Sequence, residues 1–183
     1  LFFLDADNQI PPGAIRALLR GADNYDIVDG VIETVSISGI RGVHRNFPGE
    51  DYSRHTHFQD LFQRKRSGML QGSLYSRHLL DKGCLSVVSP HLHDDLVQRA
   101  KAVMASTSIS YCDTVSYIYH RRADSLTGVP SLSSTLGLLS SFAEWHTIVQ
   151  ASFDVSFLAD IQLGFAASVH HQVANLMESL TQS

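Results

Sequence analysis

The sequence predicts an α/β fold followed by a mostly α-helical C-terminal segment. Strands are predicted at residues 1–4, 27–37 and 70–74, and segments with helical spacing alternate with them. After Pro130 the pattern changes to two long stripes of apolar residues at helical spacing. Apolar residues make up 44% of the 183 residues, so the chain can bury a full core.

The composition excludes several classes of protein. Charged residues are only 17% of the chain, which argues against a disordered tail. Fourteen basic and eighteen acidic residues give a net charge of −4, the opposite of what a nucleic-acid groove needs. The two cysteines, Cys84 and Cys112, form no CxxC pair and suit a reducing compartment. No segment has the continuous apolar character of a transmembrane helix.

The first element is expected to be a strand at residues 1–4, buried on both faces because all four residues are apolar. A helix is expected to follow Pro12 and to end at Gly21. The chain opens in the middle of the strand, with neither Met nor a basic leader, which favours a fragment whose upstream part is missing.

The middle of the chain alternates between strands and irregular segments. Residues 27–37 are rich in Val and Ile and predict one or two strands. Residues 39–66 have weak periodicity and predict a long surface excursion with short helical pieces. Residues 70–74 predict a short strand, and residues 76–82 predict a helical turn that Gly83 closes.

The elements that follow have clearer periodicity. Residues 94–104 predict an amphipathic helix with two acidic residues at its N-terminus. Residues 109–119 alternate between apolar and polar side chains, which predicts a strand with one half-buried face. Apolar stripes over residues 132–143 and 157–180 predict two further helices.

The first candidate site is Asp5-Ala6-Asp7, directly after the first strand. Ligands of open α/β sheets collect beyond the carboxyl ends of the strands. Two carboxylates in such a place favour a hard divalent cation, which binds carboxylate and phosphate oxygens. A turn is an equally good interpretation, because Asp and Asn favour turns before a helix.

The second candidate site is Asp94-Asp95 at the start of a helix. The usual role of acidic residues there is to stabilise the helix N-terminus. A carboxylate held at a helix end can also act as a general base. A third interpretation is a zinc site, since His91, His93 and Asp95 resemble part of a metallo-hydrolase signature, in which the next position, here Leu96, is His.

The third candidate site lies at the end of the strand at residues 109–119. His120, Arg121 and Arg122, with Ser125 close behind, form a plausible clamp for phosphate. A solvated loop with a few charges explains the same residues.

The order of these motifs resembles that of family 2 glycosyltransferases. The segment LFFLDADNQIPPGAIRALL resembles the strand, Asp-x-Asp loop and helix of that family. The segment QGSLYSRHLLDKG resembles the family's Leu-Tyr-Arg segment. The family's Glu-Asp helix resembles PHLHDDLVQRAKAVMAS, and its Tyr-x-Arg strand with a Ser-x-Thr-Gly loop resembles SISYCDTVSYIYHRRADSLTG. Four blocks in family order are more specific than any one block.

The resemblance implies a GT-A-like mixed sheet that is partial, because the N-terminal strands that bind the nucleotide base are absent from this chain. Residues 1–128 would be the C-terminal half of a GT-A domain, and residues 129–183 a helical extension that can serve oligomer assembly. The implied partners are a nucleotide-sugar, expected to be a UDP-sugar, and a polysaccharide or lipid-linked saccharide acceptor. The implied location is the cytoplasm, with peripheral association at the inner face of the membrane.

The resemblance also assigns roles to residues. Asp7 would hold Mg²⁺ or Mn²⁺ on the diphosphate, and Asp5 would contact the ribose or a metal-bound water. Asp95 would be the catalytic base of an inverting transfer, with Asp94 beside it. The loop that closes over the diphosphate would contain His120, Arg121 and Arg122. We therefore expect the aspartates of the loop, Asp95 and this closing loop to line one cleft.

Two other functions remain open at the level of sequence. The first is a metal-dependent hydrolase that uses His91, His93 and Asp95, with His146 or His170 completing the site. The second is a non-catalytic interaction domain in which the helical segment serves assembly.

Overall fold

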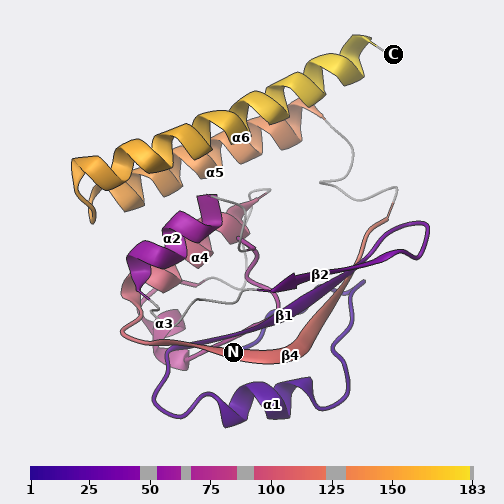
Figure 1. Cartoon of the computed structure of the whole chain (residues 1–183), viewed down its shortest axis with the longest axis vertical. Helices are drawn as coiled ribbons and strands as arrows, with labels where there is room; N and C mark the ends of the chain where they lie inside the picture. Colours follow the sequence, from indigo (N-terminus) through magenta and orange to yellow (C-terminus); the bar gives the residue numbers. More distant parts are fainter. Residues whose placement is uncertain (46–52, 63–66, 86–92, 123–130, 182–183) are drawn as a thin grey trace.

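The computed structural model describes residues 1–45, 53–62, 67–85, 93–122 and 131–181. It confirms a mixed α/β architecture (Figure 1). One helix covers one face of a twisted sheet, further helices cover the other face, and two long C-terminal helices form an outer layer beyond them. None of the described helices combines the length and the apolar character that a membrane crossing needs.

The sheet is built around β1 (Ile27–Val35), whose first six residues are buried. Along one edge β1 pairs in parallel with β4 (Ile109–His120). Along its other edge it pairs antiparallel with two short strands, β2 (Arg41–Arg45) and β3 (Ser73–Tyr75). The strands predicted at residues 27–37, 70–74 and 109–119 are therefore confirmed, with β3 shifted towards the C-terminus.

Four helices flank this sheet. The first, α1 (Ala14–Arg20), packs on β4 and ends at Gly21, whose N–H donates to the carbonyl of Leu18. On the opposite face lie α2 (Arg54–Phe62) and α4 (Asp94–Ala105), and the short α3 (Arg77–Asp81) follows β3. The sequence predicted α1, α3 and α4 at these places.

The C-terminal segment forms two antiparallel helices, α5 (Leu132–Gln150) and α6 (Val155–Thr181), as the apolar stripes predicted. They share one core with the α/β part, since Trp145 is 1% exposed and its ring lies 5.6 Å from that of Phe58 on α2. The predicted domain boundary at residue 128 lies outside the described residues.

Two expectations were wrong. Residues 1–4 are not a strand buried on both faces, because Leu1 and Leu4 are 42% and 51% exposed and only Phe2 forms a bridge, with Leu74. Residues 39–66 are more than a surface excursion, because they contain β2 and α2, and Phe58 is fully buried. The periodicity is weak since β2 is an edge strand and α2 buries only a few side chains.

The expected alternation along β4 also fails at one point. Ser116 and Tyr117 are adjacent in sequence, and both are fully buried. The pairing with β1 contains register shifts on either side of Val31, and such irregularities re-aim the side chains of the bulged strand. Tyr117 directly follows this irregularity, and its hydroxyl donates a hydrogen bond to Asp5.

Candidate functional site

The loop at residues 5–8 crosses from one edge of the sheet to the other. Before the loop Phe2 bridges to Leu74 on β3, and after it Gln9 bridges to Ile118 on β4 through two backbone hydrogen bonds of 2.8 and 3.1 Å. The two bridges fix both ends of the loop. Its two aspartates are therefore held beside the C-terminal end of β4, where ligands of α/β sheets bind.

The carboxylate of Asp5 is oriented by two neutral donors. The Gln71 amide nitrogen lies 3.2 Å from Oδ1 and 3.1 Å from Oδ2 of Asp5. The Tyr117 hydroxyl donates to Oδ2 over 2.8 Å. Burial of Tyr117, followed by its hydrogen bond to Asp5, raises the pKa of this hydroxyl, so it stays protonated and remains a donor.

Asn8 and Arg122 hold the second half of the loop. The Asn8 amide donates to Oδ1 of Asp7 over 3.1 Å, and its oxygen accepts from the backbone N–H of His120 over 2.8 Å. The guanidinium of Arg122 forms an ion pair with Oδ2 of Asp7 at 3.3 Å. The end of β4 and the aspartate loop are thus in direct contact.

Asp95 lies in the first turn of α4, where its Oδ1 accepts the N–H of Leu96 over 3.0 Å. The pKa of Asp95 is raised to about 6, mainly by burial and in addition by the negative charges of Asp94 and Asp5, whereas the hydrogen bond from the Leu96 N–H opposes the shift. Asp5 therefore lies near enough to Asp95 for their charges to interact. Asp94 instead accepts from the side chain of Gln98 on its own helix.

The structure thus brings together most of the residues that the sequence singled out. Asp5, Asp7 and Arg122 meet at the loop, and Asp95 lies within electrostatic reach of Asp5. The side chain of Arg121 is exposed, and its backbone N–H pairs with the carbonyl of Val35. The Ser-x-Thr-Gly segment that follows lies outside the described residues.

One ring nitrogen of His120 lacks a hydrogen-bond partner among the described residues. This atom, Nε2, is buried. A buried imidazole nitrogen without a partner is costly, and a phosphate oxygen or another polar ligand would satisfy it.

The residues predicted for a zinc site are only partly described. His93 is the residue before α4, has a φ of 68°, and its Nε2 lies 3.0 Å from the Ser134 hydroxyl on α5. His91 lies outside the described residues. Within the described part of the chain, no three His, Cys, Asp or Glu side chains are grouped so that they could hold a metal ion.

The chemistry of the aspartate loop fits a hard cation held jointly with a ligand. Asp7 is exposed, and its carboxylate contacts Asn8 and Arg122, so lone pairs remain for a cation. Mg²⁺ characteristically uses one or two protein carboxylates together with substrate phosphates. Such a site needs no third protein ligand.

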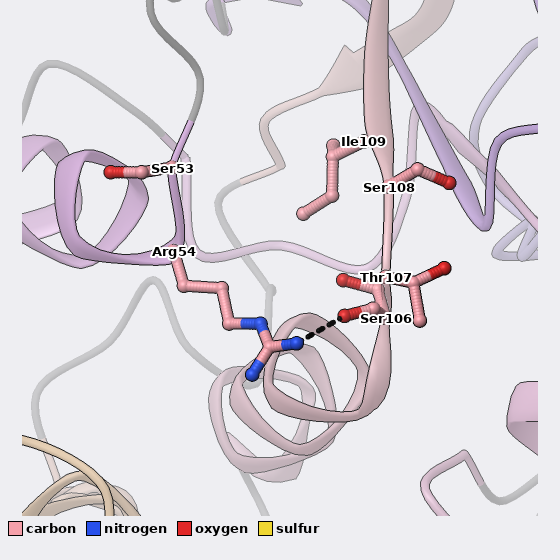
Figure 2. A pocket seen from close by; sticks show the side chains of 6 residues that line it. All are labelled: Ser53, Arg54, Ser106, Thr107, Ser108 and Ile109. Carbon is pink, nitrogen blue, oxygen red and sulfur yellow. Dashed lines mark hydrogen bonds between the residues drawn. The ribbon is translucent and has the colours of Figure 1, made fainter.

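A separate pocket of about 180 Å³ lies at the far end of β4 (Figure 2). In it Arg54 donates to the carbonyl of Ser106 over 3.0 Å. The hydroxyls of Ser106, Thr107 and Ser108 each donate to another acceptor of the protein, so the pocket offers an anion little beyond one guanidinium. Its lining residues are Ser53, Arg54, Ser106, Thr107, Ser108 and Ile109.

Sequence reasoning missed three residues of the site, namely Asn8, Gln71 and Tyr117. Tyr117 was counted only as an apolar position of an alternating strand, and Gln71 only as part of the short strand predicted at residues 70–74. Their roles depend on long-range contacts, since 66 positions separate Gln71 from Asp5 and 112 separate Tyr117 from it. Asn8 alone carried a local signal, because it directly follows the Asp-x-Asp pattern.

Comparison with known proteins adds no assignment. No protein-family model matches the chain, and no curated protein matches it. The resemblance to family 2 glycosyltransferases therefore rests on the motifs and on their order in this sequence.

Proposed function

We propose that this chain is part of an inverting glycosyltransferase of the family 2 type, with a GT-A-like fold. It is the part that binds the cation and the diphosphate and that supplies the catalytic base. The observation that carries the proposal is that the aspartate loop contacts the end of β4, where Arg122 forms an ion pair with Asp7. Asp95 lies close enough to Asp5 for the two carboxylates to interact electrostatically. Cation, phosphate and proton chemistry are then available at one end of the sheet.

In this proposal Asp7, assisted by Asp5, holds Mg²⁺ or Mn²⁺ on the diphosphate of a nucleotide-sugar. The cation supplies positive charge that stabilises the departing diphosphate. Arg122 is well placed to exchange its ion pair with Asp7 for one with the diphosphate, because it already lies at the loop. Arg121 and the Nε2 atom of His120 add further contacts to the phosphates.

The proton chemistry is assigned to Asp95. Its carboxylate takes the proton from an acceptor hydroxyl, whose oxygen forms a bond to the anomeric carbon of the donor sugar. The bond between that carbon and the diphosphate oxygen breaks at the opposite face, so the configuration inverts. A pKa of about 6 suits a general base that works near neutral pH.

The proposed donor is a UDP-sugar, and the proposed acceptor is a polysaccharide or a lipid-linked saccharide. Because nucleotide-sugars are the substrates, we expect the reaction on the cytoplasmic side, at the inner face of the membrane. The helical pair of α5 and α6 is the segment that we expect to serve assembly or peripheral attachment.

The test is Mn²⁺-dependent release of UDP from a panel of UDP-sugars, measured with saccharide acceptors. We expect Asp95→Asn to lower turnover by about 10²- to 10⁴-fold, the range for loss of a general base, while Mn²⁺-dependent stabilisation by UDP is retained. Asp81→Asn is the matched control, because Asp81 is an exposed carboxylate on α3.

Three outcomes would contradict the proposal. Zinc that stays tightly bound through His91 and His93, with no stabilisation of the protein by Mn²⁺ and UDP, would favour the hydrolase. Absence of both turnover and cation binding would favour the non-catalytic interaction domain. Equal activity of wild type and Asp95→Asn would remove Asp95 from the mechanism.

A further inference from the structure

We propose that Gln71 and Tyr117 are positioning residues that hold the carboxylate of Asp5 in the orientation needed for cation and diphosphate binding. The inference rests on the proposed function, because it gives that site a supporting layer. Both residues lie in blocks quoted for the resemblance, Gln71 in QGSLYSRHLLDKG and Tyr117 in SISYCDTVSYIYHRRADSLTG, but the resemblance assigned a role to neither of them. Both are identified by their contacts alone.

The three hydrogen bonds fix the plane of the Asp5 carboxylate. The Gln71 nitrogen bridges both carboxylate oxygens, at 3.2 and 3.1 Å, and the Tyr117 hydroxyl approaches Oδ2 at 2.8 Å. An exposed aspartate otherwise rotates freely about its side-chain bonds. One donor comes from the turn before β3 and the other from β4, and together they remove this freedom before any ligand binds, which lowers the cost of binding.

Both donors are electrically neutral, and this distinguishes Asp5 from Asp7. Asp7 pairs with the guanidinium of Arg122, whereas Asp5 accepts hydrogen bonds from the amides of Asn8 and Gln71 and from the Tyr117 hydroxyl. A neutral donor orients a carboxylate without cancelling its charge. Asp5 therefore keeps its attraction for a cation while its geometry is fixed.

The positions of the two donors are themselves determined by the fold. Tyr117 is fully buried, and the neighbouring Ser116 donates to the carbonyl of Gly72 over 2.6 Å. The same carbonyl accepts the N–H of Gly30 on β1 over 3.0 Å. Since Gly72 follows Gln71 directly, these bonds anchor the backbone from which Gln71 reaches Asp5.

The glycines at this contact leave no space for a side chain. A Cβ atom on Gly30 would lie 2.2 Å from the Ser116 hydroxyl oxygen, and one on Gly72 would lie 2.7 Å from a side-chain carbon of Ile32. Gly72 also has a φ of +80°, which L side chains rarely adopt. The close packing makes the platform beneath Gln71 and Tyr117 rigid.

The test measures binding of Mn²⁺ with inorganic pyrophosphate to the whole chain by calorimetry. We expect Tyr117→Phe and Gln71→Met each to weaken binding by about 10-fold or more, as loss of a ligand-orienting partner does. Tyr119→Phe is the matched control, because it removes a hydroxyl from the same strand and should leave binding unchanged. The melting temperature of each variant is recorded alongside.

The outcomes separate this inference from the proposed function. If wild type binds and both variants bind equally well, the positioning role is overturned and the proposed function stands. If the variants bind normally but melt at lower temperature, the two residues are structural only, and the inference is overturned. If wild type does not bind and Asp7→Asn changes nothing, the proposed function fails, and the inference fails with it.

Discussion

At the scale of single residues, Asp95 is the group whose chemistry the fold changes most clearly. Burial disfavours its ionised form, and the charges of Asp94 and Asp5 act in the same direction. The pKa of about 6 therefore places its titration close to neutral pH. Two measurable consequences follow, one for catalysis and one for stability.

The rate of the proposed transfer should depend on the ionised form of Asp95. Below pH 6 we expect kcat/KM to rise about 10-fold per pH unit, and above pH 6 to level off, because a general base works only when deprotonated. The measurement is a pH profile of UDP release. A profile that is flat between pH 5 and 7 would contradict the assignment.

The same pKa predicts the effect of Asp95→Asn on folding. Because the pKa is raised in the folded state from 3.8 to about 6, the folded chain binds the proton more tightly, so wild-type stability falls as pH rises from about 4 to 6. The amide variant lacks this penalty. We expect it to be more stable than wild type at pH 7.5 by up to about 3 kcal/mol, from about 1.4 kcal/mol per pKa unit.

The difference in stability between wild type and Asp95→Asn should nearly vanish at pH 3.5, because Asp95 in the folded wild type is then protonated and, like the amide, uncharged. Urea unfolding at the two pH values measures it. A variant that is less stable than wild type at pH 7.5 would show that the Asp95 carboxylate is satisfied by partners in its ionised form.

At the scale of elements, a buried ion pair ties α4 to the central strand β1. Arg99 and Asp29 are each 1% exposed. One terminal nitrogen of the Arg99 guanidinium lies 2.7 Å from Oδ1 and 2.6 Å from Oδ2 of Asp29. Ser73 and Tyr75 on β3 complete the network with bonds to Arg99 of 3.3 and 2.8 Å. The network fixes α4, and with it Asp95, relative to the sheet.

Removal of one partner should therefore be costly. Asp29→Asn leaves the Arg99 charge buried without its counter-ion, and we expect a loss of about 3–5 kcal/mol in the free energy of unfolding. Glu144→Gln is the control, since its ion pair with Lys101 links exposed side chains of α5 and α4 and contributes about 0–1 kcal/mol. Equal losses in urea unfolding would mean that the buried network does not stabilise α4.

The elements differ in how well the sequence predicted them. The helix at residues 94–105 and the strand at 109–120 have strong local periodicity, so their positions were predicted closely. Residues 1–4 were predicted wrongly, because an apolar run does not reveal whether a neighbouring strand covers it. At the site, Asp7 and Asp95 belong to local motifs, whereas Gln71 meets Asp5 only through tertiary folding.

At the scale of the whole molecule, the C-terminal helices are part of the main core. Trp145 and Val149 of α5 and Phe157 of α6 belong to the same buried cluster as Phe58 and Val103 of the α/β part. A helical extension predicted from composition alone carries no such information, because apolar stripes do not specify what they pack against.

Truncation of a core residue on α5 should thus destabilise the whole chain. We expect Trp145→Ala to lower the free energy of unfolding by about 3–5 kcal/mol, in a single transition. Leu136→Ala on the same helix is the control, because Leu136 is 56% exposed and its loss should cost little. Two separate transitions, with the sheet unaffected by the Trp145 variant, would show that the helices fold as an independent unit.

The central claim is that the aspartate loop, the end of β4 and the start of α4 form one cation site. Paramagnetic broadening of backbone NMR signals by Mn²⁺ with pyrophosphate tests it most directly. We predict selective broadening at Asp5, Asp7, Gln71, Asp95 and Arg122, which is abolished in Asp7→Asn, while signals around Arg54 stay sharp. Broadening that is centred on His93, or that persists unchanged in Asp7→Asn, would contradict the claim.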